Sequence, residues 1–236
     1  MPRQLCTIEP MNAVVLLSGG LDSTTVAYLA KSEGYTLYAL SFDYHQRHRR
    51  ELAAAKAVAA AVGVREHRLV SFDLSLWGGS ALTDDALEVP LHRSAETMTT
   101  SIPITYVPAR NTIFLSFALG YAEVVGAQAV FAGMNALDYS GYPDCRPDYL
   151  AAMEEVFRLG SKAGREDHPI KILTPLIQKT KREIVEWGNT FQVPWALTYS
   201  CYQGNVDSCG VCDSCTLRLN AFREAGLVDP ISYAKL

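Results

Sequence analysis

A glycine-rich turn is the first segment of the chain whose residue types suggest chemistry. The continuous apolar run 13–17 leads directly into Ser18-Gly19-Gly20-Leu21-Asp22-Ser23. Between a strand and a helix, such a turn gathers backbone N–H groups and hydroxyls around an anion. A carboxylate such as Asp22 suits the divalent cation of a polyphosphate. The turn therefore predicts a polyphosphate site, with a plain helix-capping turn as the alternative.

Four cysteines form a second candidate site near the end of the sequence. Cys201, Cys209, Cys212 and Cys215 lie within fifteen residues of one another. Four thiolates complete a tetrahedral Zn²⁺ site, and a site closed by four protein ligands is structural. Two disulfides are an alternative, disfavoured in a cytosolic chain. An iron–sulfur cluster is the second alternative to a zinc site, because the last three cysteines also match ferredoxin-type spacing.

The elements that must position these residues follow from the apolar pattern. Strands are expected near residues 13–17, 36–42, 67–70 and 129–132, and helices near 51–62 and 111–125. Another helix is expected after the glycine-rich turn, with Val26, Leu29 and Ala30 as its apolar stripe and Gly34 as its end. Further helices are expected from Thr180, where Thr180 and Glu183 form a capping-box pattern, and from Asp213. Alternating strands and helices predict an α/β fold, a parallel sheet covered on both faces. Ligands of such sheets bind at the carboxyl ends of the strands.

The composition limits the class of protein. The chain has 236 residues, 49% of them hydrophobic, and a formal net charge of −4. We expect a phosphate-binding α/β domain over 11–195 and a small zinc-binding region over 196–236, with a long loop over 71–107. The acidic balance disfavours a duplex nucleic-acid partner. The sequence shows neither an apolar membrane span nor a signal peptide, which predicts a cytoplasmic location.

The glycine-rich turn resembles the Ser-Gly-Gly-x-Asp-Ser loop of the PP-loop ATP pyrophosphatase superfamily. In that superfamily the loop follows the first strand of a Rossmann-like sheet and holds the pyrophosphate of ATP. The resemblance implies that a carbonyl or carboxylate oxygen of the substrate attacks the α-phosphate.

Three further stretches, 41–48, 107–111 and 133–146, narrow this to a resemblance to the QueC family, the 7-cyano-7-deazaguanine synthases. The resemblance runs from about Val14 to Cys215, and the string Asp-Tyr-Ser-Gly-Tyr-Pro-Asp-Cys-Arg at 138–146 is specific to it. It implies a ligase that uses ATP and ammonia to convert 7-carboxy-7-deazaguanine to 7-cyano-7-deazaguanine, in queuosine biosynthesis. An adenylated carboxylate and an amide would be the intermediates. It also implies Mg²⁺, one Zn²⁺ per chain and a homodimer that binds neither nucleic acid nor membrane.

The resemblance assigns site residues to this sequence. ATP would be held by Leu16, Leu17, Ser18, Gly19, Gly20, Leu21, Asp22, Ser23, Thr24, Thr25, Val26, Ser41 and Phe42. Asp22, Ser23 and Arg110 would be catalytic. Arg110, Asp138, Tyr139, Tyr142, Asp144 and Arg146 would bind the substrate. All but Arg110 follow the strand at 129–132, so they emerge at the carboxyl edge of the sheet.

Several assignments have alternatives. Arg110 could form a surface salt bridge, and Cys145 could be a reactive thiol or a packed side chain. Lys179 or Lys181 could reach a phosphate or remain solvated. His45 and Ala109 stand where the family usually or often has glycine. Either those turns accept an ordinary negative φ, or the loops are rearranged.

Two functional rivals remain open at the level of the sequence. The first is a PP-loop enzyme that thiolates tRNA and carries an iron–sulfur cluster on the cysteines. The acidic charge balance argues against it, since it would need a basic face. The second is a regulator that binds ATP without turnover and uses the cysteine region for interaction.

Overall fold

A parallel sheet forms the centre of the protein. The computed structural model describes residues 11–94, 97–98, 102–137 and 142–234. Within them the sheet has five strands in the order β3-β2-β1-β4-β5, all parallel. The strands are β1 (Asn12–Leu16), β2 (Thr36–Asp43), β3 (Glu66–Ser71), β4 (Ala129–Phe131) and β5 (Lys171–Leu173). The order reverses between β1 and β4, so the switch point at which ligands bind lies at their carboxyl ends.

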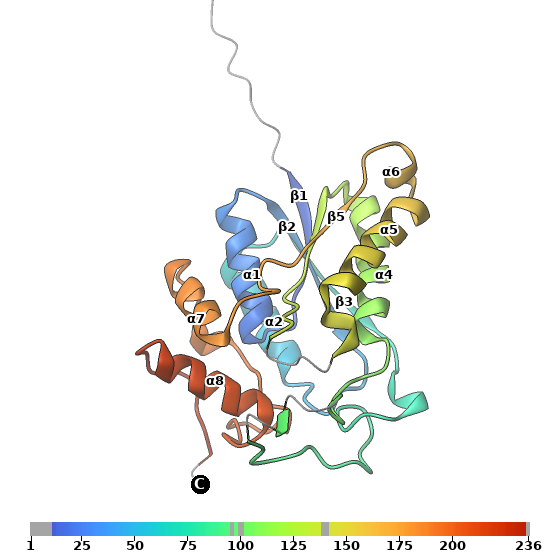
Figure 1. The fold of residues 1–236 in the computed structure, drawn as a ribbon. Helices are drawn as coiled ribbons and strands as arrows, with labels where there is room; N and C mark the ends of the chain where they lie inside the picture. The colour runs from blue at the N-terminus through green and yellow to red at the C-terminus, as the bar shows by residue number, and fades with distance from the viewer. Residues whose placement is uncertain (1–10, 95–96, 99–101, 138–141, 235–236) are drawn as a thin grey trace, which may run out of the picture.

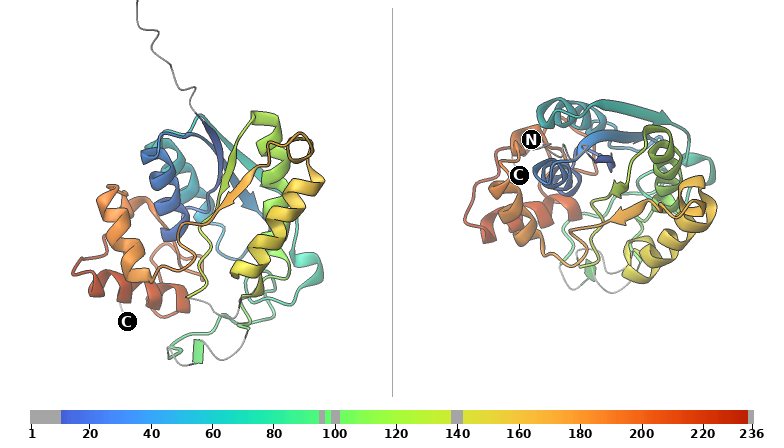
Figure 2. Two further views of the ribbon diagram at one scale, coloured as in Figure 1. Left: turned by 45° about the horizontal axis from the view of Figure 1, so that its top comes forward. Right: turned by 90° about the horizontal axis from the view of Figure 1, so that it is seen from above.

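Helices cover both faces of this sheet, as predicted (Figures 1 and 2). The helices are α1 (Leu21–Ser32), α2 (Glu51–Val62), α4 (Arg110–Val125), α5 (Pro147–Gly160), α6 (Lys162–Arg165), α7 (Lys181–Thr190) and α8 (Asp213–Glu224). Ala13 and Val15 of β1 pack with α1 and α2, whereas Val14 packs with α4 and α5. Burial on both faces explains why β1 is a continuous apolar run. Among the described residues, no helix is long and apolar enough to cross a membrane.

Most predicted elements are confirmed, and three were missed. Helix α2 has the predicted bounds and ends at Gly63 in the left-handed conformation. At the start of α7, Thr180 and Glu183 form the predicted capping box. The sequence reading did not identify β5, α5 or α6. Of these, β5 has only three residues.

The C-terminal segment packs on the sheet domain through buried aromatic and charged groups. Trp195 meets Phe222 of α8 edge to face, with ring centroids 5.5 Å apart. Arg218 of α8 is 2% exposed and pairs with Asp229 at 2.6 Å. The domain boundary expected after residue 195 stays a prediction.

The long segment between β3 and α4 is held against the cysteine region. Its described parts contain one 3-10 turn, η1 (Ser75–Trp77), and no strand of the sheet. Leu91 forms an isolated bridge with Cys212, and the His92 amide donates to the Val211 carbonyl at 2.9 Å. Arg93 adds an ion pair with Asp213 at 2.9 Å. This loop is therefore anchored by backbone and charge contacts at a point far along the chain.

The ordinary negative φ expected as one alternative for His45 and Ala109 is wrong. Their φ is positive, 63° at His45 and 56° at Ala109. The left-handed region admits a Cβ at a cost of roughly 1–2 kcal/mol per residue. The other alternative, a rearranged loop, stays a prediction. Ala109 is the N-cap of α4 and sits directly before Arg110.

We expect Ala109→Gly to stabilise the protein by up to about 1 kcal/mol, because glycine removes the left-handed penalty but adds unfolded-state entropy. Urea unfolding would measure this change. Ala53→Gly, at an exposed interior position of α2, is the control and should lower stability by about 1 kcal/mol. Equal destabilisation by both variants would contradict the strain at Ala109.

Candidate active site

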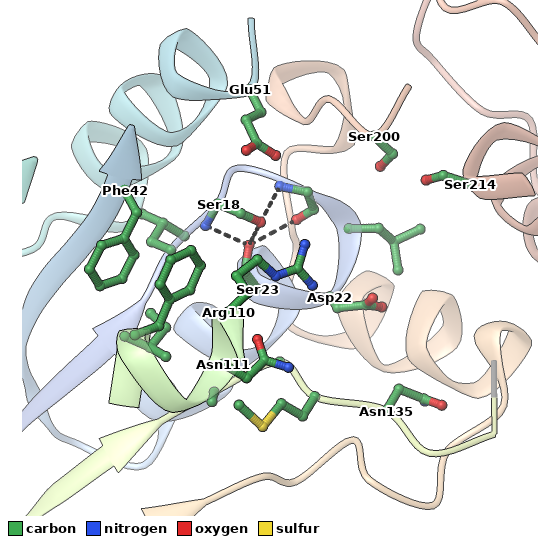
Figure 3. Close-up of a pocket in the computed structure, with 18 of the residues that line it drawn as sticks. Ser18, Asp22, Ser23, Phe42, Glu51, Arg110, Asn111, Asn135, Ser200 and Ser214 are labelled. Carbon is green, nitrogen blue, oxygen red and sulfur yellow. Dashed lines mark hydrogen bonds between the residues drawn. The ribbon is translucent and has the colours of Figure 1, made fainter. Parts of the chain in front are cut away.

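The glycine-rich turn forms a closed hydrogen-bonded loop between β1 and α1 (Figure 3). The Ser18 and Ser23 hydroxyl oxygens are 3.0 Å apart, and the Ser18 amide donates to the Ser23 hydroxyl at 3.2 Å. The Gly20 amide donates to the Ser18 hydroxyl at 3.3 Å. Gly19 has φ +80°, and a Cβ there would lie 2.3 Å from the Ala55 nitrogen. Only glycine fits this position, which allows the loop to sit against α2.

A lysine from α7 completes the loop. The Lys181 ammonium lies 2.7 and 2.6 Å from the two carboxylate oxygens of Asp22. Lys179 points elsewhere, 3.4 Å from Glu183 and 4.4 Å from the centre of the Trp187 ring. Of the two candidate lysines, the structure brings Lys181 to the loop. This places a cation and a carboxylate at the amino end of α1, where an anion is favoured.

The loop opens into a cavity of about 260 Å³ at the switch point of the sheet. Of the residues expected to hold ATP, these line it: Leu16, Leu17, Ser18, Gly20, Leu21, Asp22, Ser23 and Phe42. Gly19, Thr24, Thr25, Val26 and Ser41 are not part of its lining. Thr25 donates to the Leu21 carbonyl inside α1. The Ser41 hydroxyl bonds to the Leu17 carbonyl and to His67 Nε2, so its side chain is already engaged.

One wall of the cavity is a flat aromatic surface. Phe42, at the end of β2, stacks on Phe114 of α4 with ring centroids 4.0 Å apart and an interplanar angle of 7°. Both rings line the cavity. An apolar planar wall suits the face of a purine ring. The sequence reading had identified Phe42 but not Phe114, which falls within an evenly apolar helix.

Arg110 lines the same cavity as the glycine-rich loop and does not lie on an open surface, and Figure 3 shows its side chain beside Ser23. It is the first residue of α4, and its guanidinium is 3.5 Å from the Tyr44 hydroxyl. Burial raises the pKa of Tyr44, an effect that the positive charge of Arg110 opposes, so this tyrosine is neutral near pH 7. No carboxylate lies within ion-pairing distance of Arg110 among the described residues. A half-buried guanidinium facing a cavity can bind a carboxylate or a phosphate.

The segment after β4 supplies the next wall. The Tyr142 hydroxyl is 2.9 Å from the Thr105 hydroxyl, and the Tyr142 ring lines the cavity. Asp144 accepts from the Asn111 amide at 3.1 Å with one carboxylate oxygen. Its other carboxylate oxygen is buried without a partner among the described residues. Asp144 thus anchors the start of α4 and, unlike Tyr142, does not itself line the cavity.

The remaining predicted substrate residues lie apart from this wall or outside the described residues. Arg146 is exposed, at the N-cap of α5, and does not line the cavity. Asp138 and Tyr139 lie outside the described residues.

Cys145 is a packed side chain. It is 7% exposed, and its sulfur accepts from the Asn111 side-chain amide at 3.3 Å. Burial raises the pKa of the thiol to about 12, so it is protonated at neutral pH and a poor nucleophile.

Sequence reasoning missed several residues that line the cavity. They are Tyr44, His48, Glu51, Asn135, Ser200, Ser214 and Arg218. The i, i+3 spacing of His48 and Glu51 within the 41–48 stretch and the helix after it is the one local signal that could have indicated a pair. The others come from segments far apart in the sequence.

The four C-terminal cysteines meet at one point. Their four sulfur atoms all lie within 4.8 Å of one another, and those of Cys209 and Cys215 are 3.9 Å apart. Metal–sulfur bonds of 2.3 Å in a tetrahedron would place sulfurs about 3.8 Å apart, so one ion fits. The amides of Gln203 and Cys209 donate to the Cys201 sulfur at 3.4 and 3.3 Å, as expected around a thiolate ligand.

The two alternatives for these cysteines fit less well. None of the five described cysteines is in a disulfide. A four-iron cluster binds its four cysteines through four different irons and so needs a wider set of sulfurs than a single ion does. The compact cluster therefore favours a single metal ion.

Comparisons with known proteins identify the family of this chain. The family model described as "Queuosine biosynthesis protein QueC" matches residues 12–226. The 7-cyano-7-deazaguanine synthase of Cyanothece sp. is 64% identical over 228 residues, covering 94% of this chain and 100% of that protein. The 7-cyano-7-deazaguanine synthase of Nostoc punctiforme is 63% identical over 224 residues, covering 95% and 100%.

A solved structure supports the fold. The NMN synthetase of Francisella tularensis superposes with a TM-score of 0.50 at 16% identity, covering 93% of this chain and 79% of that one. The parallel sheet, the glycine-rich loop at its switch point, the cysteine cluster and a family match along nearly the whole sequence lead to one conclusion: this chain belongs to the QueC family.

Proposed function

We propose that this chain is a 7-cyano-7-deazaguanine synthase, an ATP-dependent carbon–nitrogen ligase that uses 7-carboxy-7-deazaguanine and ammonia. The relatives that match it along their whole length carry the name of that enzyme. The observation that carries the proposal is one cavity that joins the glycine-rich loop to the guanidinium of Arg110. A polyphosphate and a substrate carboxylate can therefore lie side by side.

The first chemical step is activation of the carboxylate. Hydroxide is a poor leaving group, so the carboxylate oxygen attacks the α-phosphate of ATP to give an acyl-adenylate and pyrophosphate. The loop amides and the hydroxyls of Ser18 and Ser23 bind the leaving pyrophosphate, and Lys181 compensates its charge. Arg110 holds the carboxylate against the phosphate, so the reaction depends on positioning rather than on a protein nucleophile.

Adenine and deazapurine take different walls of the cavity in this proposal. The stacked rings of Phe42 and Phe114 receive the adenine, while Tyr142 lies against the deazapurine. Asp22 lines the cavity with a partly exposed carboxylate, so its chemistry fits Mg²⁺, which would neutralise phosphate charge.

In the later steps, ammonia replaces AMP to give the amide. A second ATP then activates the amide oxygen, and loss of this oxygen leaves the nitrile.

The cysteine cluster is proposed as a structural zinc site. Cys201, Cys209, Cys212 and Cys215 would fill all four positions of the ion, so no position remains for a substrate. The expected homodimer is part of the same proposal. The rival tRNA thiolase with an iron–sulfur cluster is not favoured, given the family match and the compact sulfurs.

The reaction can be tested directly by mass spectrometry. The purified chain is incubated with ATP, Mg²⁺, ammonium and 7-carboxy-7-deazaguanine, and we expect the masses of the amide, the nitrile and AMP. Asp22→Ala should reduce product formation at least about 10²-fold while the circular dichroism spectrum stays unchanged, because the carboxylate that would hold Mg²⁺ is lost. Undiminished turnover in Asp22→Ala would refute the assigned role of the loop.

Lys181 and Lys179 form a matched pair for a second test. Lys181→Ala should slow adenylation about 10²-fold, since it removes the cation beside the loop. Lys179→Ala should keep the wild-type rate, because that lysine pairs with Glu183 and Trp187 instead. ATP–pyrophosphate exchange in the presence of 7-carboxy-7-deazaguanine measures the step. Equal losses in both variants would argue against a specific role for Lys181.

Cys212→Ser tests the metal site. We expect the wild-type chain to hold about one zinc and no iron. The variant should lose zinc and thermal stability together, because the free energy of metal binding contributes to the free energy of folding. Elemental analysis and thermal unfolding provide the two readouts. Cys145→Ser is the control and should keep its zinc, since Cys145 is not in the cluster. Iron in the wild-type protein would contradict the zinc site and favour an iron–sulfur cluster on the four cysteines.

A further inference from the structure

Three polar side chains between β2 and α2 meet at the cavity, and none has a role in the activation of the carboxylate. They are Gln46, His48 and Glu51, and the last two line the cavity. All three belong to or follow the 41–48 stretch that characterises the sequence. Their arrangement carries an inference about the second substrate, ammonia.

Glu51 is a carboxylate held by two side-chain donors. One of its oxygens accepts from the Gln46 side-chain amide at 2.8 Å, and the other lies 3.4 Å from His48 Nε2. The exposed fraction of the Glu51 side chain is 14%, and that of His48 is 6%. Gln46 is itself fixed, because its amide donates to the Phe42 carbonyl and its oxygen accepts from the Tyr44 amide. The carboxylate is therefore preorganised at the cavity.

The hydrogen bonding of His48 follows from its surroundings. Its Nδ1 atom is buried and has no hydrogen-bond partner among the described residues. Its Nε2 atom faces the Glu51 carboxylate and can donate to it. Gln46 and His48 thus orient Glu51 at the cavity.

Glu51 lines the same cavity as the phosphate loop and Arg110. It is the first residue of α2, and its carbonyl oxygen would lie 2.8 Å from a Cβ on Gly19. Its charge also acts on Tyr44, whose hydroxyl is 3.5 Å from Arg110. Figure 3 shows the Glu51 side chain above the loop, on the side of Ser200, with Arg110 below the loop. An acyl-adenylate bound in this cavity would share it with the Glu51 carboxylate.

We propose that Glu51, oriented by Gln46 and His48, binds the ammonium ion and accepts its proton as ammonia attacks the acyl-adenylate. This rests on the proposed function. At neutral pH most ammonia is ammonium, which has no lone pair, so a ligase that uses it needs a cation site with a base. The preorganised carboxylate of Glu51 supplies both, and its negative charge repels the carboxylate substrate from the same place.

The step balances in atoms and charge. Ammonium transfers one proton to Glu51, and the lone pair left on nitrogen forms the C–N bond. The C–O bond to AMP breaks, and its electron pair goes to the phosphate oxygen of AMP. That phosphate takes up the second proton lost by nitrogen. Amide, AMP and a protonated Glu51 result, and Glu51 then returns its proton to solvent.

Glu51→Gln tests the proposal, since it keeps the shape and the hydrogen bond from Gln46 while removing the charge. Three rates are compared with wild type. They are ATP–pyrophosphate exchange with 7-carboxy-7-deazaguanine, amide formation with ammonium, and hydroxamate formation with hydroxylamine, a nucleophile that is largely unprotonated at neutral pH. We expect normal exchange, a loss of at least about 10²-fold in kcat/KM for ammonium, and nearly normal hydroxamate formation.

The other outcomes overturn the proposal and identify the error. Loss of exchange in Glu51→Gln would place Glu51 in the ATP or Mg²⁺ site. Equal losses with ammonium and hydroxylamine would mean that Glu51 only positions the acyl-adenylate. An unchanged rate with ammonium would remove Glu51 from the reaction. Absence of exchange in the wild-type chain would instead refute the proposed function.

Asp43→Asn is the matched control. Asp43 is also a buried carboxylate close to this segment, but it pairs with Arg49 and does not line the cavity. We expect all three rates of this variant to remain close to wild type. A selective loss with ammonium in Asp43→Asn would attribute the effect to general negative charge and contradict the assignment to Glu51.

Discussion

The site depends on close backbone contacts around the glycine-rich loop. A Cβ on Gly19 would overlap the backbone of α2 at Ala55, and a Cβ on Gly133 would lie 2.9 Å from the Ser23 amide nitrogen. The loop is thus pressed between the start of α2 and the strand end of β4, with no room for side chains. Because protein interiors are close-packed, such contacts transmit displacement rather than absorb it. The walls that carry Phe42, Glu51 and Tyr142 take their positions from this junction.

The charged side chains of the cavity stand at separate positions around it. Lys181 and Asp22 lie together on the α7 side, Arg110 stands at the start of α4, and Glu51 stands at the start of α2. Each belongs to a different helix, and each helix begins near the carboxyl edge of the sheet. Opposite charges at fixed separations can hold a polyphosphate, a carboxylate and a cation at once without neutralising one another. The geometry suits a reaction that brings together several charged reactants.

The local parts of this design could be read from the sequence. The apolar run of β1, the glycine that ends α2 and the capping box of Thr180 and Glu183 depend on neighbouring residues, and the structure confirms them. The cysteine cluster could also be predicted from the sequence, because its four cysteines lie within one short segment.

Contacts between distant segments could not be predicted from the sequence. Asp22 and Lys181 are 159 positions apart, and Phe114 reaches Phe42 from another helix. The departures at His45 and Ala109 were noticed, but their positive φ could not be inferred, because sequence alone does not show whether a fold will bear the strain.

The strand order also governs how the chain can be assembled during synthesis. Val14 of β1 pairs with Tyr38 on one side and with Val130 on the other. A nascent chain can therefore join β1 to β2 early, but the second edge of β1 has no partner until residue 130 has left the ribosome. Nonlocal parallel pairing of this kind is slow, and an open apolar edge invites association with other chains. Of the four strand pairings of this sheet, the one that completes the strand leading into the phosphate-binding turn thus spans the longest stretch of chain.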